Sequence, residues 1–318
     1  LVAMSLQIQR SPGPAKKGKR KSGGCSALAV LLLIGLLVAL YFGAEHVTKA
    51  LDIADQVDDA AILGPVLAKN IGLKVDKATR SRMAYLASRH YFTQENYGVA
   101  MGLLRMVTKD SPVFVDSEAL RGVLLTQQGR YNDALAPLLT AQQLAKNKKS
   151  DRFQAVMQMN VARAYYAAGN FPRAMQAYAD VPRGSAVWLD STYERAWAHF
   201  QITDMAGAIA LLMNTGSPFF EDWYFPEADL LRTYALFMMC KFPSASVEIQ
   251  SFIDQYTPIK EELDKLAPTM DAQKGWAEGT AYAKDQSTTV PGMILRKFKT
   301  DDRFNSSMVA IENADEEI

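Results

Sequence analysis

Few residues in this 318-residue chain have the type and spacing that catalysis requires. Two carboxyl groups that converge on one point can act as general acid and general base. The candidates are Asp55, Asp58 and Asp59, followed much later by Glu221 and Asp222. The three aspartates share one face of a predicted helix, where a solvated charged surface explains them, and the other two acids are adjacent rather than convergent. We therefore expect no catalytic carboxylate pair.

Metal binding and nucleophilic chemistry have no better support. The chain contains three histidines and two cysteines, and it has no HExxH, GxGxxG or GxxxxGK[ST] motif. His90 and His199 stand at positions of aromatic packing, and Cys240 lies in an apolar helical segment where a packed thiol is the simplest interpretation. The sequence thus predicts no catalytic residue, no metal site and no cofactor, and we expect that the protein is not an enzyme.

The net charge of +1 conceals an uneven distribution of charge. Residues 1–44 contain six basic residues and no acidic one, so residues 45–318 hold 29 basic and 34 acidic residues. Contacts with nucleic-acid phosphates require clustered cations, and a mildly acidic body does not provide them. We therefore expect no nucleic-acid partner. The composition, with 49% hydrophobic and 22% charged residues, is typical of a globular protein.

An apolar segment follows the basic N-terminal tail of residues 1–24. Residues 26–43 (SALAVLLLIGLLVALYFG) carry no charge, and as a helix they would be about 27 Å long, close to the thickness of a hydrocarbon core. A buried helix of a globular domain should have a polar face, and this segment is apolar all round. We therefore predict a transmembrane anchor at 25–44. A cleaved signal peptide is the alternative, although Phe42 is bulky for a cleavage site that ends at Ala44.

The charges around this segment predict its orientation. The cations upstream of the anchor favour a cytoplasmic N-terminus, so that the residues from 45 onward would lie across the membrane. We expect a single-pass protein of the inner (cytoplasmic) membrane with its body in the periplasm.

The rest of the chain is predicted to be helical and repetitive. Apolar residues recur at three- and four-residue spacing. A short motif, an aromatic residue or Met followed three positions later by Ala, occurs five times, at Tyr97–Ala100, Tyr131–Ala134, Phe171–Ala174, Met205–Ala208 and Phe242–Ala245. Its copies are separated by 34, 40, 34 and 37 positions. A period near 34 residues indicates a helix–turn–helix repeat, whose units bury their apolar faces only by stacking.

These residues resemble the tetratricopeptide repeat (TPR) family over about 80–257. In one unit the small residue Gly122, the turn residue Gly129, Tyr131 and Ala134 follow the family pattern, and the unit with Ala162 and Phe171 follows it as well. The resemblance implies an all-α, right-handed α-solenoid of about five helix pairs behind the N-terminal transmembrane helix. We expect linking helices at 45–79, capping helices at 258–286 and a C-terminal tail at 287–318.

In TPR proteins the first helix of each pair lines a concave face that holds protein or peptide partners. The resemblance therefore implies a partner-binding groove of aromatic residues and arginines, residue types that anchor peptides well. Its expected residues are Arg82, Tyr85, Arg89, Phe92, Arg163, Tyr166, Tyr193, Trp197, Phe200, Tyr234 and Phe237. The alternative is that these side chains pack against neighbouring helices.

The segment 217–226 (SPFFEDWYFP) is the most aromatic stretch of the chain. It could expose an aromatic patch for an interaction, or it could fill the space between the fourth and fifth repeats. Together with the anchor and the residues that follow, it resembles envelope-anchored TPR proteins of gliding and predatory bacteria.

The leading hypothesis is a non-catalytic, membrane-anchored TPR scaffold or adaptor that binds a protein or peptide partner in a cell-envelope complex for secretion, folding or motility. One alternative is a TPR targeting receptor that faces the cytosol, which requires the opposite orientation in the membrane. Another is a secreted, chaperone-like periplasmic TPR protein, which requires cleavage of the apolar segment.

Overall fold

The computed structural model describes Leu51, residues 60–146, 150–220 and 223–300, Phe304 and Met308. All regular elements of this part of the chain are helices. The predicted anchor at 25–44 and the basic tail before it lie outside the described residues. Among the helices that are described, none combines the length and the apolar character needed to cross a membrane. The chain divides into two compact units, Leu1–Gly169 and Asn170–Ile318, which we describe separately.

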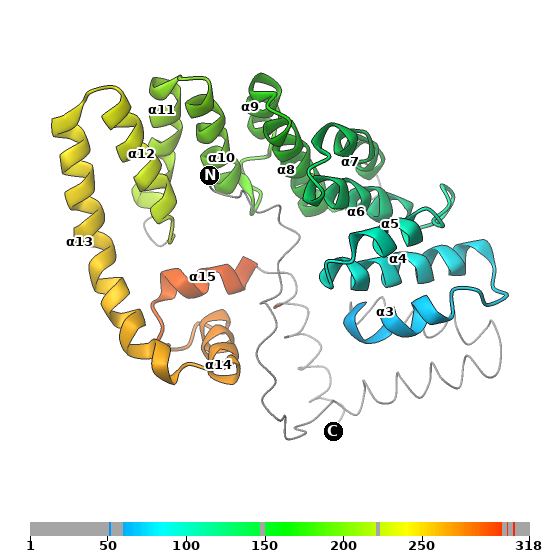
Figure 1. The fold of residues 1–318 in the computed structure, drawn as a ribbon. Helices are drawn as coiled ribbons and strands as arrows, with labels where there is room; N and C mark the ends of the chain where they lie inside the picture. The colour runs from blue at the N-terminus through cyan, green and yellow to red at the C-terminus, as the bar shows by residue number, and fades with distance from the viewer. Residues whose placement is uncertain are drawn as a thin grey trace. The chain divides into compact units, whose positions relative to one another are not determined.

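The described part of the first unit is a succession of six helices in which each packs against the next one along the chain (Figure 1). They are α3 (Ala60–Lys69), α4 (Lys77–Thr93), α5 (Tyr97–Leu104), α6 (Phe114–Gln127), α7 (Tyr131–Ala145) and α8 (Asp151–Ala167). Helix α3 precedes the first predicted repeat and packs against α4 through Leu63, Leu67 and Met83. The linking region expected at 45–79 thus contributes a helix to the core of this unit.

Within the second unit each helix from α9 to α13 likewise packs against the next one, and a short pair of helices follows in the described residues (Figure 1). Its helices are α9 (Phe171–Ala179), α10 (Trp188–Gln201), α11 (Met205–Thr215), α12 (Pro226–Met238), α13 (Phe242–Leu266), α14 (Ala272–Ala283) and α15 (Gly292–Thr300). Helix α13 does not end at Pro258, where we expected capping helices to begin. A proline removes one backbone donor and bends a helix, but the helix can continue on both sides of it.

The five copies of the motif found in the sequence mark the starts of five helices. Their first residues begin α5, α7, α9, α11 and α13. The alanine three positions later is at most 4% exposed in every copy. The helices that precede them begin at intervals of 37 or 38 residues, at Lys77, Phe114, Asp151, Trp188 and Pro226. The predicted all-α helical repeat is therefore confirmed in the described residues.

The turn between the two helices of a repeat has the same backbone conformation in all five copies. The second residue before each of these five helices has a positive φ between 57° and 75°, at Glu95, Gly129, Gly169, Thr203 and Cys240. At Gly129 the N–H bonds to the carbonyl of Thr126 and the next N–H bonds to Leu125, which is the Schellman arrangement. The turn predicted at Gly129 is thus confirmed, and Gly169 has the same left-handed conformation.

The small residue of the repeat also has the expected role where α6 crosses α7. A Cβ atom placed on Gly122 would lie 2.4 Å from Cγ of Leu138 and 3.3 Å from the carbonyl oxygen of Ala134. Because any side chain at this position would collide with α7, glycine allows the two helices to approach closely.

Candidate partner-binding surface

Three aromatic rings connect α10 to α12 in the second unit. The ring of Trp197 lies 5.6 Å from that of Phe200 in an edge-to-face arrangement, and Phe200 lies 5.5 Å from Tyr234 on α12. One turn earlier, Tyr193 lies edge-to-face on Phe225 at 5.0 Å. The helical period places Tyr193, Trp197 and Phe200 on one side of α10, and aromatic pairs at these separations stabilise their own arrangement.

The rings of α10 are partly covered, whereas the matching row on α12 is open to solvent. Tyr193, Trp197 and Phe200 pack against a core that includes Leu212 and Leu231. On α12, Leu230, Tyr234 and Phe237 are 52%, 52% and 53% exposed and follow one another at four- and three-residue spacing. We call these three residues the α12 face. An exposed row of large apolar side chains beside a stacked aromatic ladder is typical of an interaction site.

The groove residues expected in the first unit are half-buried or buried. On α4, Tyr85 and Phe92 pack against the leucine core between α5 and α6, and the guanidinium carbon of Arg89 lies 6.0 Å from the centre of the Tyr85 ring. Arg82 is also half-buried, as is Tyr166 on α8. Arg163 on α8 is buried, and this arginine is therefore part of the protein interior.

The second repeat interrupts the aromatic row. Counted back from the start of α7, the positions that correspond to Tyr193, Trp197 and Phe200 are occupied on α6 by small or aliphatic residues, which are Ala119, Val123 and Thr126. All three are buried. Of the eleven groove residues predicted from the sequence, the structure brings together the five of the second unit: Tyr193, Trp197 and Phe200 on α10, and Tyr234 and Phe237 on α12.

Most of the aromatic segment 217–226 packs against its own unit. Phe220 contacts the rings of Trp188 and Trp223, and Tyr224 lies edge-to-face on Tyr256 of α13. The guanidinium of Arg296 on α15 lies 4.8 Å above the ring of Trp223, which attaches α15 to this segment by a cation–π contact. These contacts agree with the space-filling interpretation, although Phe219 is almost fully exposed.

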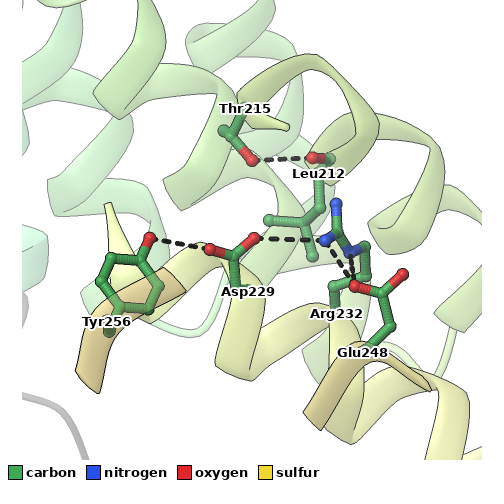
Figure 2. A network of polar contacts seen from close by, with 6 residues as sticks. All are labelled: Leu212, Thr215, Asp229, Arg232, Glu248 and Tyr256. Atoms are coloured by element: carbon green, nitrogen blue, oxygen red, sulfur yellow. Dashed lines mark hydrogen bonds and ion pairs between the residues drawn. The ribbon is translucent and has the colours of Figure 1, made fainter. Parts of the chain in front are cut away.

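A polar network that we did not predict joins α12 to α13 (Figure 2). Arg232 donates from Nε to Oε2 of Glu248 at 3.0 Å, and its Nη2 lies 3.2 Å from Oδ1 of Asp229. The hydroxyl of Tyr256 donates to the other oxygen of Asp229 at 2.9 Å. Asp229 and Arg232 have helical spacing in the sequence, but nothing in it indicates that Glu248 and Tyr256 would meet them.

Burial controls the protonation of this network. It raises the pKa of Asp229, against the hydrogen bond from Tyr256 and the charge of Arg232, which lower it. Burial and the neighbouring Asp229 carboxylate raise the pKa of the Tyr256 hydroxyl, which therefore stays a hydrogen-bond donor at neutral pH. Each group has its partners within the repeat, and the network acts as a structural connection between two helices.

His199 and Asp204 form a second polar contact, which is partly buried, between the end of α10 and the start of α11. Nδ1 of His199 lies 2.8 Å from Oδ2 of Asp204, and the other carboxylate oxygen accepts the N–H of Gly207 at 2.9 Å. The pKa of Asp204 is lowered, mainly by the hydrogen bond with His199. This pair caps α11, as Asn96 and Asn170 cap α5 and α9.

In the part of the chain that the structure describes, no group of three or more His, Cys, Asp or Glu side chains could hold a metal ion.

No known family model matches the chain, and no curated protein matches its sequence. Solved structures similar to it include a putative kinesin light chain with TPR-like repeats from Podosopora anserina, with a TM-score of 0.46 and 15% identity, covering 58% of this chain and 99% of that one. Another is the C-terminal part of a TPR repeat-containing protein from Cytophaga hutchinsonii, with a TM-score of 0.49 and 15% identity, covering 80% of this chain and 93% of that one. Both are TPR-like repeat proteins.

Proposed function

We propose that this protein is a non-catalytic scaffold that binds an apolar segment of a protein partner through the α12 face and the adjacent rings of α10. The observation that carries the proposal is the half-exposed row of Leu230, Tyr234 and Phe237, which lies beside the ladder of Trp197 and Phe200. Large rings with few rotatable bonds provide contact area at low entropic cost, and such residues dominate the energy of interfaces.

The test uses the full chain with Tyr234→Ala and Phe237→Ala combined. Both side chains are half exposed, so their truncation should leave the fold intact, whereas Trp197 and Tyr193 also support the core. Met213→Ala on α11 is the matched control, because Met213 is also exposed in the same unit. Purification from crosslinked cells, followed by quantitative mass spectrometry, identifies the proteins that each variant retains.

We expect the double variant to lose a defined set of proteins that the wild-type chain and the control retain. A synthetic segment from the strongest of these should bind the wild-type chain and lose about 30-fold or more in affinity for the double variant, since hot-spot residues contribute about 2 kcal/mol or more. Retention of the same proteins by the double variant would show that the α12 face is not the binding surface.

We further propose that residues 26–43 anchor the scaffold in the inner membrane, with a cytoplasmic N-terminus and a periplasmic body that belongs to a cell-envelope complex. The support is the charge-free apolar segment and the basic residues before it. A tether would confine the scaffold to the membrane and raise its effective concentration for membrane-bound partners.

Protease added to intact spheroplasts tests this topology with a C-terminal tag. Loss of the tag before lysis is the expected result. Protection of the tag until lysis would contradict it and would favour a receptor that faces the cytosol. Absence of the N-terminal peptide from the mature chain would instead indicate a cleaved signal and a secreted protein.

A further inference from the structure

One position of the repeat is buried in four copies and exposed in the fifth. It is the eighth residue of the second helix of each pair. Leu104, Leu138, Tyr178 and Leu212 occupy this position on α5, α7, α9 and α11, and each is at most 1% exposed. On α13 the same position is Ile249, which is 49% exposed.

The following helix accounts for the burial of the first four residues. Leu104 packs with Leu120 and Leu124 of α6, and Leu138 packs with Val161 and Ala164 of α8. In the second unit, Tyr178 donates a hydrogen bond to Glu194 of α10, and Leu212 packs with Ala228 and Leu231 of α12. Ile249 occupies the position that the following helix covers in the other four copies. Among the described residues no helix covers α13 in this way.

The exposed side of α13 carries a row of three large apolar residues and one serine. Phe242, Ile249 and Ile253 are 52%, 49% and 47% exposed, and Ser246 completes a spacing of four, three and four residues. We call these four residues the α13 stripe. Between its ends the single charged residue is Glu248, which is engaged by Arg232. The centres of interfaces are depleted of charge in the same way.

We propose that the α13 stripe is a self-association surface, on which α13 of a second copy of this chain packs in antiparallel orientation. A two-fold axis that passes between Ser246 and Ile249 places Phe242 opposite Ile253 of the second copy. The same axis places Ser246 opposite Ile249 of the second copy. Large side chains then face each other at the two ends, and the small serine leaves room for isoleucine in the middle.

A two-fold contact of this kind uses one patch on both copies and closes on itself. The second copy would take the place that the following helix takes in the other four copies of the repeat, and it would cover apolar surface that is exposed on α13 among the described residues. The stripe is about 17 Å long at the rise of an α-helix. This length is at the small end for protein interfaces, and we therefore expect a reversible dimer whose population depends on concentration.

The first test measures the mass of the purified full chain, in mild detergent, over a wide range of concentrations. We expect a monomer–dimer equilibrium for the wild-type chain and a shift to monomer of at least 10-fold in concentration for Ile249→Glu. Met213→Glu, an exposed apolar-to-acidic change on α11, should leave the equilibrium unchanged. Helical circular dichroism of all three chains verifies that each is folded.

A second measurement tests the orientation of the two helices. In a chain with Cys25 and Cys240 replaced by serine, Ser246→Cys should allow a short thiol crosslinker to join two copies, since the two positions are about 5 Å apart along the helix axes. In the wild-type chain the same reagent should not join two copies through Cys240, whose positions are about 22 Å apart in this arrangement.

Three results would overturn the proposal. A wild-type chain that stays monomeric at every concentration excludes the second copy, and a dimer that persists in Ile249→Glu shows that copies meet elsewhere. Crosslinking through Cys240 as well as through position 246 indicates parallel helices. Ile249→Glu should keep the protein partners that the α12 face binds, so this proposal and the proposed function can fail independently.

Discussion

The hydroxyl of Tyr256 on α13 donates a hydrogen bond of 2.9 Å to Oδ2 of Asp229 on α12, 27 residues earlier in the chain. The same carboxylate lies 3.2 Å from Arg232, which in turn bonds to Glu248 of α13 (Figure 2). This network holds α12 and α13 together. It makes the stability of that pair depend on a few polar groups.

Removal of the Tyr256 hydroxyl should destabilise the fold. Tyr256→Phe leaves the partly buried carboxylate of Asp229 without one of its donors, and we expect a loss of about 1–2 kcal/mol in the free energy of unfolding. Urea denaturation followed by circular dichroism measures it. Tyr234→Phe is the control, because the Tyr234 ring is half exposed. Equal stability of the two variants would show that the hydrogen bond contributes nothing.

The contact between His199 and Asp204 should make stability depend on pH in the acid range. The pKa of Asp204 lies below its ordinary value of 3.8 in the folded chain, chiefly because His199 shares a hydrogen bond with it. The stabilisation is therefore present above the unfolded pKa and is lost as the pH falls through the folded pKa. In Asp204→Asn, which retains a capping side chain, the loss of stability between about pH 5 and pH 3 should be smaller.

Urea midpoints at the two pH values provide the measurement for this prediction. Asp254→Asn, a change on the exposed side of α13, serves as the comparison. An equal reduction of the pH dependence in both variants would argue that the contact with His199 is not its cause.

Glycine substitutions in the turns between paired helices should stabilise the protein. Thr203 and Cys240 adopt φ values of 63° and 57°, which cost energy for a residue with a side chain and most for a β-branched one. We expect Thr203→Gly to raise the free energy of unfolding by about 1 kcal/mol and Cys240→Gly by somewhat less. Gly129→Ala should lower it by about 1 kcal/mol, because Gly129 has a φ of 74°.

Thermal unfolding of the three variants measures these effects. If Thr203→Gly unfolds at a lower temperature than the wild-type chain, the strain at this turn is outweighed by the entropy of the unfolded glycine.

The crossing of α6 and α7 should tolerate no added atom at Gly122. Gly122→Ala places a methyl group against Leu138 and should cost about 1–3 kcal/mol. Leu138→Ala alone should cost about 2–5 kcal/mol, because Leu138 is fully buried. In the double variant the new methyl group enters the space that Leu138 vacates, so the combined loss should be smaller than the sum. Additive losses in a double-mutant cycle would contradict the predicted contact.

Local sequence patterns were sufficient to predict the helical repeat. The motif from Tyr131 to Ala134 identifies the start of a helix, because its alanine must lie against the preceding helix of the same pair. Gly129 identifies the turn before it, because a positive φ favours glycine. Thr203 and Cys240 show where such reasoning fails, since the fold enforces the same conformation on residues that give no local signal.

The chemistry of the last repeat was beyond prediction from the sequence. Helical spacing places Asp229 beside Arg232, but the meeting of both with Glu248 and Tyr256 depends on how α13 is rotated against α12. The predicted groove has the same limit. Arg163 and Tyr234 occupy the same position in their repeats, but Arg163 is buried and Tyr234 is half exposed.

The sequence by itself determined which residues of each helix share a face, since the helical period is a property of the chain. Only the tertiary structure decided whether a face is covered, because burial depends on a neighbouring helix as well as on the residue. Leu212 and Ile249 are both aliphatic and occupy the same position of the repeat. Leu212 is buried beneath α12, and Ile249 remains exposed on α13 because no described helix follows in the corresponding place.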